Sequence, residues 1–327
     1  MTSLDPVPAP ARSAPDRSAP DRFRVALPAP LDVPASLAFL SKWGDDLLDR
    51  WDGAHLVRTV NSSGRAIPFV GVPAGTVAEP ALDVTIEHAA DRPSVEAAVR
   101  RMFVFPPPEF GELLAHDPLL AALDARHPGL REVRQLDLFA ALVRAISAQQ
   151  VNLRWATTTR RRLSEAFGER HVVDGQEVYS LAPARLAEVE VAAIRALQFT
   201  TRKAEYIRHA AAASASGQLD LATLDALPDE EVIARLTALR GIGRWTAEWV
   251  LARTLGRPRV VAGDLGVRKV VGAAYLRATD LPSEDAVRRA TAHWGSSATV
   301  AQALLLRTYG EPVEALASAE AYGPAST

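Results

Sequence analysis

The chain has no cysteine among its 327 residues, and this absence excludes several kinds of chemistry at once. Disulfide frameworks, Fe–S clusters, Cys-based zinc sites and thiol nucleophiles all require that residue. Catalysis must therefore come from carboxylates, histidine, lysine, hydroxyls or a borrowed cofactor. Long apolar runs are also missing, because none approaches the roughly 20 residues that a membrane helix requires. We expect a cytoplasmic protein without a signal peptide or membrane contact.

An excess of charge of either sign is missing as well. The 37 Lys and Arg residues against 39 Asp and Glu residues give a net charge of -2. This balance does not indicate a nucleic-acid partner, but a local basic face can coexist with acidic surface elsewhere. Hydrophobic residues make up 48% of the chain, which at this length is enough for two or three domains.

Both ends of the chain have little that could fill a core. Residues 1–22 are mostly Pro, Ala, Ser, Asp and Arg, with SAPDR written twice, and they predict a disordered tail. A transit peptide is the weaker interpretation, since such peptides are poor in acidic residues and this stretch has three aspartates. Residues 316–327 predict a second loose tail.

Residues 23–110 predict a small α+β domain. A strand at 23–27 is followed by a stretch of helical period at 36–51, and then by HLVRTV and AIPFVGV, which the turn-rich NSSGR joins as a hairpin. The segment ALDVTIEH at 81–88 alternates like a half-buried strand, and helical spacing returns after it. Consecutive prolines in FPPPEF, at 105–110, mark the end of this domain.

Residues 111–315 are expected to be helical almost throughout, so the fold class is mostly α with a smaller N-terminal α+β domain. Asn152 is placed to cap a helix through LRWATTTRRRLSEAF. The run Arg160–Arg162 in this helix predicts a solvated face, because a basic run with a glutamate nearby is commonplace.

The most informative stretch is a helix, a tight turn and a second helix, with the hairpin at 239–244. Glycines in Arg240-Gly241-Ile242-Gly243 allow positive φ and close approach of the backbone, while the amides of the helix starting near Arg244 form an anion site. A phosphodiester fits this description. By itself, Gly-Ile-Gly is more often only a compact turn. The candidate contacts to a DNA backbone are Gly241, Gly243, Arg244, Thr246, Arg240 and Lys269.

The wider context of this turn is more specific. The pattern L-x-G-I-G-x-W-T-A, followed nineteen residues after Trp245 by Asp264 inside GDLGVRK, resembles the hairpin and catalytic aspartate of helix-hairpin-helix DNA glycosylases. More narrowly, it is similar to the AlkA type, the family of 3-methyladenine DNA glycosylase II. LVRAISAQQV at 142–151 and HPGLR at 127–131 match the same family in its order, and the likeness covers approximately 23–310.

The resemblance implies a monofunctional N-glycosylase that flips an alkylated purine, such as 3-methyladenine or 7-methylguanine, out of duplex DNA and hydrolyses its glycosidic bond. Alkylation leaves the base positively charged, so it departs readily as an oxocarbenium-like sugar develops. Asp264 is the carboxylate that would stabilise this cation, although an Asp here also suits an N-cap. Trp245 and Leu265 would line the base pocket, with burial in the core as the alternative for Trp245.

Two further positions follow from the resemblance. Bifunctional relatives have a Schiff-base lysine where this chain has Trp245, so we expect no lyase activity. Gln150 falls at the position of the residue that fills the gap left by a flipped base, where AlkA-type enzymes can have leucine. The alternative is that Gln149 and Gln150 only terminate a helix.

The chain departs from the family at the aromatic residue that stacks on the cationic base in the last long helix. Trp294, Arg307 and Tyr309 are the candidates to replace it, and a weaker cage puts lesion selectivity in question. The resemblance also implies a structural site for Na⁺ or K⁺, because the carbonyls of Thr237, Leu239 and Ile242 correspond to the monovalent-cation position of the family. The reaction itself requires no metal or organic cofactor.

Double-stranded DNA containing damaged bases is therefore the expected partner of a monomeric enzyme in base excision repair. Two alternatives stay open. The first is a glycosylase with a shifted range, such as hypoxanthine or etheno-adenine. The second is a noncatalytic helix-hairpin-helix module that binds distorted DNA, for which a carboxylate at Asp264 would weaken contact with phosphate.

Overall fold

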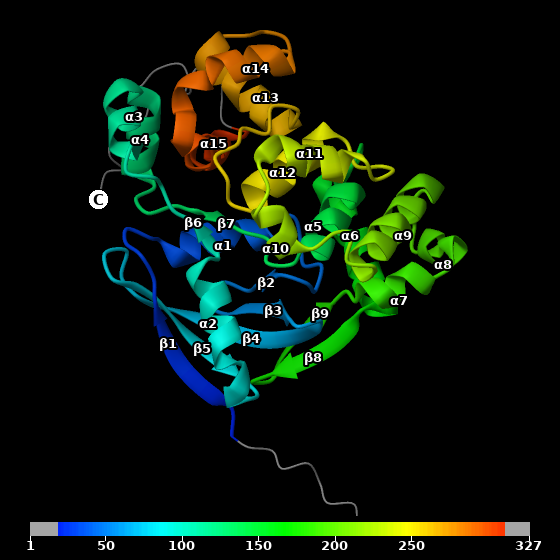
Figure 1. Cartoon of the computed structure of the whole chain (residues 1–327). Helices are drawn as coiled ribbons and strands as arrows, with labels where there is room; N and C mark the ends of the chain where they lie inside the picture. The colour runs from blue at the N-terminus through cyan, green and yellow to red at the C-terminus, as the bar shows by residue number, and fades with distance from the viewer. Residues whose placement is uncertain (1–18, 311–327) are drawn as a thin grey trace, which may run out of the picture.

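The computed structural model describes residues 19–310. Its N-terminal part contains a five-stranded antiparallel sheet in the order β1-β5-β4-β3-β2 (Figure 1). Helices α1 and α2 pack on it, and the core between them contains Leu37, Phe69, Leu82 and Val99. The elements are β1 (Asp21–Ala26), α1 (Val33–Ser41), β2 (Arg50–Trp51), β3 (Leu56–Ser62), β4 (Arg65–Gly75), β5 (Pro80–Ile86), η1 (Ala89–Asp91) and α2 (Arg92–Arg100).

The structure confirms the hairpin joined by NSSGR, because β3 and β4 pair antiparallel across it. The strand predicted at 81–88 is β5, which lies between β1 and β4. Strand β1 begins at Asp21, so the tail that we predicted over 1–22 extends two residues too far. Residues 1–18 and the second predicted tail, 316–327, lie outside the described residues.

The helix predicted over 36–51 is wrong in its second half, since α1 ends at Ser41. Gly44 has a φ of +114°, and the side chains of Asp45 and Asp46 accept the backbone N–H groups of Leu47 and Leu48. Short acidic side chains that bond the local backbone in this way compete with helix formation. The segment therefore turns back into β2.

From Phe110 onward the chain is mainly helical, as predicted. Asn152 caps α6 as expected, because its side chain accepts the Trp155 N–H at 2.8 Å. The elements are α3 (Phe110–His116), α4 (Pro118–Arg126), α5 (Leu138–Ala148), α6 (Leu153–Phe167), α7 (Pro183–Glu188), α8 (Val191–Ala196), α9 (Thr201–Ala215), α10 (Leu221–Asp225), α11 (Asp229–Thr237), α12 (Arg244–Arg253), α13 (Leu265–Val271), η2 (Gly272–Leu276), α14 (Glu284–Ala290), η3 (Ala292–Ser297), α15 (Ala298–Leu305) and η4 (Leu306–Thr308). None of the helices within residues 19–310 is long and apolar enough to cross a membrane.

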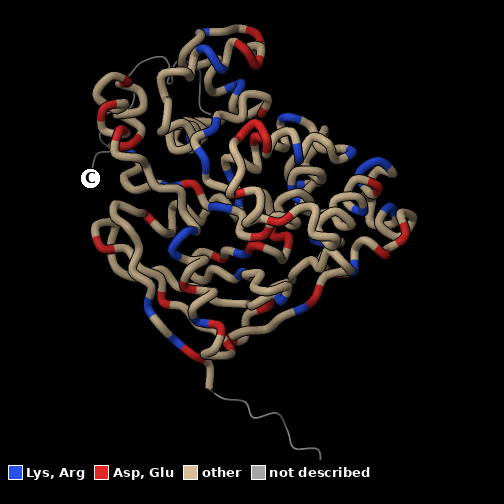
Figure 2. Tube along the Cα trace, viewed as in Figure 1, with Lys and Arg blue, Asp and Glu red and all other residues tan. Residues whose placement is uncertain are grey.

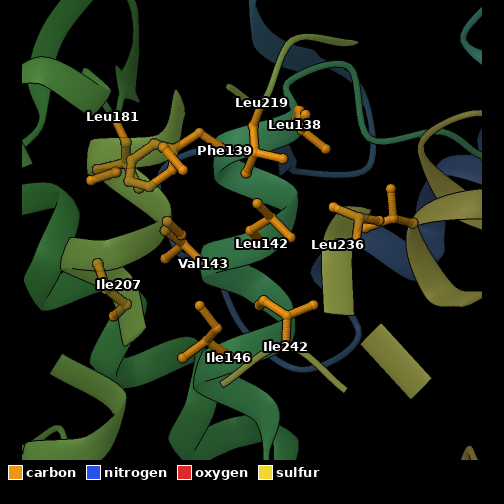
Figure 3. Close-up of a cluster of buried hydrophobic side chains, with 14 of the residues drawn as sticks. Leu138, Phe139, Leu142, Val143, Ile146, Leu181, Ile207, Leu219, Leu236 and Ile242 are labelled. Carbon is orange, nitrogen blue, oxygen red and sulfur yellow. The ribbon is translucent and has the colours of Figure 1, made fainter. Parts of the chain in front are cut away.

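These helices pack around two separate hydrophobic clusters. The first surrounds α5, whose apolar side chains face neighbours from α9, α11 and the hairpin (Figure 3). The second joins α3 and α4 to α13, α14 and α15, although more than a hundred residues separate them in sequence. Figure 1 shows α3 and α4 beside α15. Short strands β6 (Phe103–Val104) and β7 (Glu132–Val133) pair antiparallel, with Val104 in the second cluster and Phe103 and Val133 in the core of the N-terminal domain. Helix α12 belongs to the first cluster and α13 to the second, so their junction joins two cores.

A β-hairpin interrupts the region expected to be helical. Strands β8 (Glu169–Val173) and β9 (Gln176–Ser180) pair through Asp174 and Gly175, which both have positive φ. Val173 and Val178 pack on Val57 and Val70 of the large sheet. Asp-Gly between β-branched residues is a strong hairpin signal, and here it outweighs the helical surroundings.

The prediction of a solvated face for Arg160–Arg162 is wrong for Arg160, whose side chain is 5% exposed. Its guanidinium donates to Asp46 of the N-terminal domain at 2.8 Å, and Arg144 pairs with the same carboxylate at 3.0 Å. Burial lowers the pKa of Arg160 to about 10. Burial opposes ionisation of Asp46, but the two arginines hold the pKa of that carboxyl well below its ordinary value. Acidic and basic residues are interspersed throughout the described chain in Figure 2, and sequence alone cannot show which of them are buried.

Candidate active site and DNA interface

The turn of the hairpin depends on two glycines in different ways. Gly241 has a φ of +89°, and a Cβ at this position would lie 2.1 Å from Cγ of Tyr206 on α9. Glycine is therefore required both by the backbone conformation and by the ring packed beneath it. Gly243 is exposed and is the N-cap residue of α12, and no described heavy atom outside its chain neighbours lies within 4 Å of the place that its Cβ would take. Nothing within the described fold demands glycine at this second position.

The predicted wedge residue lies close to this hairpin. Gln149 ends α5, and its side-chain Nε2 donates to the carbonyl of Gly241 at 3.0 Å. Gln150 follows with a φ of +53° and is exposed. Gln150 is thus an exposed residue of the turn between α5 and α6, while Gln149 ties that turn to the hairpin. The two glutamines thus differ: Gln149 ends α5, where its backbone N–H donates to the Ile146 carbonyl at 3.3 Å, but its side chain bonds the hairpin and not the last carbonyls of the helix.

Asp264 lies at the junction of the two helical cores, half-buried at the start of α13. Its Oδ1 accepts the Val267 N–H at 3.1 Å, so the N-cap that we considered is present. Its other oxygen, Oδ2, accepts the indole N–H of Trp245 at 3.4 Å. Trp245 is half-buried in the first turn of α12. The nineteen-residue spacing therefore brings the two predicted site residues together, and the carboxylate is oriented from two sides.

Other side chains surround this pair. A Cβ placed at Gly266 would lie 3.0 Å from Oδ1 of Asp264 and 3.7 Å from the ring of Tyr309. The ammonium of Lys269 lies 5.7 Å from the centre of the Tyr309 ring, within the range of a cation–π contact. Leu265 is 53% exposed, which leaves it free to contact a ligand.

Of the three residues considered for the missing stacking aromatic, only Tyr309 lies at this site. Trp294 is 1% exposed and packs against Tyr275 in the second helical cluster. Arg307 is turned toward the N-terminal domain, where its guanidinium donates to the Ala35 carbonyl. Tyr309 is 37% exposed.

The predicted contacts to a DNA backbone separate into exposed and buried groups. Arg240 and Arg244 have side chains 64% and 51% exposed, with Glu205 and Glu248 as their ion-pair partners. Thr246 is 1% exposed, so its side chain does not belong to this surface. It follows Trp245 on α12 and turns into the core of the protein.

The three residues matched to a monovalent cation site surround the same turn. Ile242 is buried, and its N–H donates to the Leu239 carbonyl at 3.1 Å. Thr237 is exposed at the end of α11, and its hydroxyl donates to the Ile233 carbonyl. These hydrogen bonds make the turn compact. The monovalent cation site at the three carbonyls stays a prediction.

An apolar surface beside Gln150 was missed in the sequence. Val151, Leu153 and Trp155 are 36%, 41% and 39% exposed, and the guanidinium of Arg162 lies over the Trp155 ring at 5.4 Å. The sequence did contain a sign of this surface. Leu153 and Trp155 are two residues apart in one helix, so their side chains cannot both face the core of the protein.

Comparisons with known proteins agree with this geometry. A family model described as HhH-GPD superfamily base excision DNA repair protein matches residues 143–296. YfjP of Bacillus subtilis is 32% identical over 190 residues, covering 58% of this chain and 65% of its own length. DNA-3-methyladenine glycosylase 2 of Escherichia coli is 33% identical over 134 residues, covering 41% of this chain and 47% of its own.

The matched regions thus span about half to two thirds of these relatives. The solved structure of a 3-methyladenine DNA-glycosylase from Archaeoglobus fulgidus superposes with a TM-score of 0.76 at 23% identity, over 88% of this chain and 98% of that one. This likeness shows the shared fold, including a smaller N-terminal α+β domain before the helices. Residues 143–296 therefore match the HhH-GPD superfamily of base excision DNA repair proteins, and the chain shares the fold of the solved glycosylase structure.

Proposed function

We propose that the protein is a monofunctional DNA N-glycosylase that excises alkylated purines, of the 3-methyladenine and 7-methylguanine type, from duplex DNA. The observation that carries the proposal is the Asp264 carboxylate, half-buried and held by Trp245 and the α13 amide. It lies next to a hairpin suited to phosphate. A module that only binds DNA has no use for a carboxylate there, because its charge repels the backbone.

The chemistry follows from the charge that develops during bond cleavage. An alkylated purine leaves as a neutral base, and the positive charge passes to the sugar. The Asp264 carboxylate stabilises this oxocarbenium-like sugar and orients the attacking water. Its two anchored oxygens limit reorganisation during the reaction, which is the condition under which one electrostatic contact contributes about a hundredfold or more in rate.

Recognition of the duplex divides between the hairpin and the α5–α6 turn. Backbone amides at Gly243 and the start of α12 grip a phosphate, with Arg240 and Arg244 adding charge. Gln150 fills the space that a flipped nucleotide leaves. Since Gln149 bonds the Gly241 carbonyl, the wedge and the phosphate grip are held at a fixed separation.

The site is set up for hydrolysis and not for strand cleavage. Trp245 has an indole where a lyase needs a nucleophilic amine. The enzyme works as a monomer and needs no metal or organic cofactor, and Na⁺ or K⁺ at the Thr237, Leu239 and Ile242 carbonyls would serve only to stabilise the turn.

A second substrate range is favoured by one observation. Tyr309 provides the stacking surface that a tryptophan provides in the family that the sequence resembles, and tyrosine is the weaker partner for a cationic base. Neutral lesions such as hypoxanthine or etheno-adenine depend less on cation–π stacking, so replacing tryptophan by tyrosine would weaken their binding less. The two ranges are alternatives within the same glycosylase mechanism.

A panel of single-lesion duplexes tests the proposal. We expect release of 3-methyladenine or 7-methylguanine, an intact abasic strand, and no protein–DNA adduct after borohydride treatment. Release of hypoxanthine or etheno-adenine alone would select the second range. Binding to distorted duplex without release of any base would refute the enzyme, and a trapped adduct would refute the monofunctional mechanism and direct attention to Lys269.

A further inference from the structure

A fully buried carboxylate lies one helical turn from the site. The Glu248 side chain on α12 is 1% exposed, and three guanidinium groups surround it. Arg244 approaches its Oε1 at 3.0 Å, Arg288 of α14 at 2.9 Å, and Arg259 at 3.8 Å. A carboxylate so deeply buried requires such partners, because removing it from water is costly.

The ion pairs continue from Glu248 through Arg288 to Glu284, which packs beside the turn that holds Asp264. Arg288 also pairs with Glu284, the first residue of α14, at 3.4 Å. The Glu284 carboxyl group lies against Gly263, where an added Cβ would be 3.1 Å from its Oε1. Gly263 directly precedes Asp264. The path therefore runs from Glu248 on α12, across α14, to the residue before the candidate carboxylate.

The same helix holds the other member of the candidate pair. Trp245 and Glu248 are three residues apart on α12, so they lie on neighbouring positions of one rigid element. Any shift of α14 relative to Glu248 changes the placement of Asp264 relative to Trp245. A second contact restrains the same segment, since Arg268 of α13 donates to the Pro282 carbonyl at 2.8 Å.

We propose that Glu248 and Arg288 are positioning residues, which hold α14 against the Gly263-Asp264 turn and so fix the carboxylate over the sugar. This inference rests on the proposed function. Arg244 also pairs with Glu248, but its role is to bind a phosphate of the DNA. When Arg244 turns outward to the phosphate, Arg288 still compensates the buried charge of Glu248. Phosphate binding then leaves the Asp264 turn in place.

The test uses single-turnover release of an alkylated base at increasing enzyme concentration. We expect Arg288→Gln to lower the saturated rate about 10-fold to 100-fold, the loss that a displacement of about 1 Å in a reacting group produces. The enzyme concentration giving half of that rate should change less than about threefold. Arg288→Lys should restore part of the rate, since it returns the charge without the forked geometry.

Two further variants separate positioning from general damage. The Glu284 side chain is on the surface, so Glu284→Gln should leave folding intact. We expect this variant to lower the saturated rate, as Arg288→Gln does. Glu230→Gln is the matched control, because Glu230 contacts Arg244 and Arg259 of the same cluster but lies off the path to Asp264. We expect it to keep the wild-type saturated rate.

The inference is overturned if both Arg288→Gln and Glu284→Gln release base at the wild-type saturated rate. It is also overturned if their loss matches only the unfolded fraction measured by thermal melting. A wild-type protein that releases no base would instead refute the proposed function, so the two failures are distinguishable.

Discussion

Substitution of Gly241 by alanine tests how tightly the hairpin packs against Tyr206 of α9. The residue has a φ of +89°, and the new Cβ would lie 2.1 Å from Cγ of Tyr206. The left-handed conformation costs a residue with a Cβ about 1–2 kcal/mol. Overpacking against a ring typically adds about 1–3 kcal/mol. We therefore expect Gly241→Ala to lower the free energy of unfolding by about 2–5 kcal/mol.

Chemical denaturation measures this loss, and the chain offers a matched control two residues away. Gly243 has a φ of -98° and open space around its Cβ position, so Gly243→Ala should lower the unfolding free energy by no more than about 1 kcal/mol, the loss expected when alanine replaces glycine at an N-cap. In a double-mutant cycle, Tyr206→Ala should recover the packing part of the Gly241→Ala loss but not the backbone part. Equal stability of the two glycine variants would refute the reasoning.

Three other perturbations follow from the structure. Asp46→Asn leaves the buried Arg160 poorly compensated and should cost about 3–5 kcal/mol at pH 7. Because the pKa of Asp46 is depressed in the folded state, its stabilising effect is complete above the ordinary carboxyl pKa and is lost as pH falls, so denaturation midpoints of variant and wild type should converge only in acid. Gly243→Val should weaken binding to damaged and undamaged duplexes alike in salt-dependent isotherms, and loss of the lesion-specific part alone would contradict a phosphate grip. Gln150→Ala should impair excision most for lesions in stable pairs, and Gln150→Leu should restore activity if filling space is its main task; equal losses opposite all four bases would argue against a wedge.

The parts of the fold that the sequence predicts best are those whose signals are local. The β3–β4 hairpin, the Asn152 cap and the Gly-Ile-Gly turn each depend on a few adjacent residues. Asp264 and Trp245 are a different case, since their meeting was predicted only through resemblance to a family in which this spacing recurs.

The parts that the sequence does not predict depend on distant partners. Arg160 looks like any arginine of a solvated face until Asp46, 114 residues earlier, provides its buried partner. Glu248 likewise resembles a surface acid next to Arg244, because its burial depends on Arg288 from another helix. The pattern of charges along a helix does not show which tertiary neighbours will desolvate them.

The role of Asp264 is tested most directly by single-turnover release of 3-methyladenine by Asp264→Asn. Asparagine keeps the oxygen that caps α13 and is equally suited to that position, and its amide nitrogen gives up only the long 3.4 Å bond from the Trp245 indole, so a purely structural aspartate would be replaced with little loss. If the charge stabilises the oxocarbenium-like sugar, release should fall about a hundredfold or more while damaged-duplex binding and the melting temperature stay near their wild-type values. Release at the wild-type rate would contradict the account.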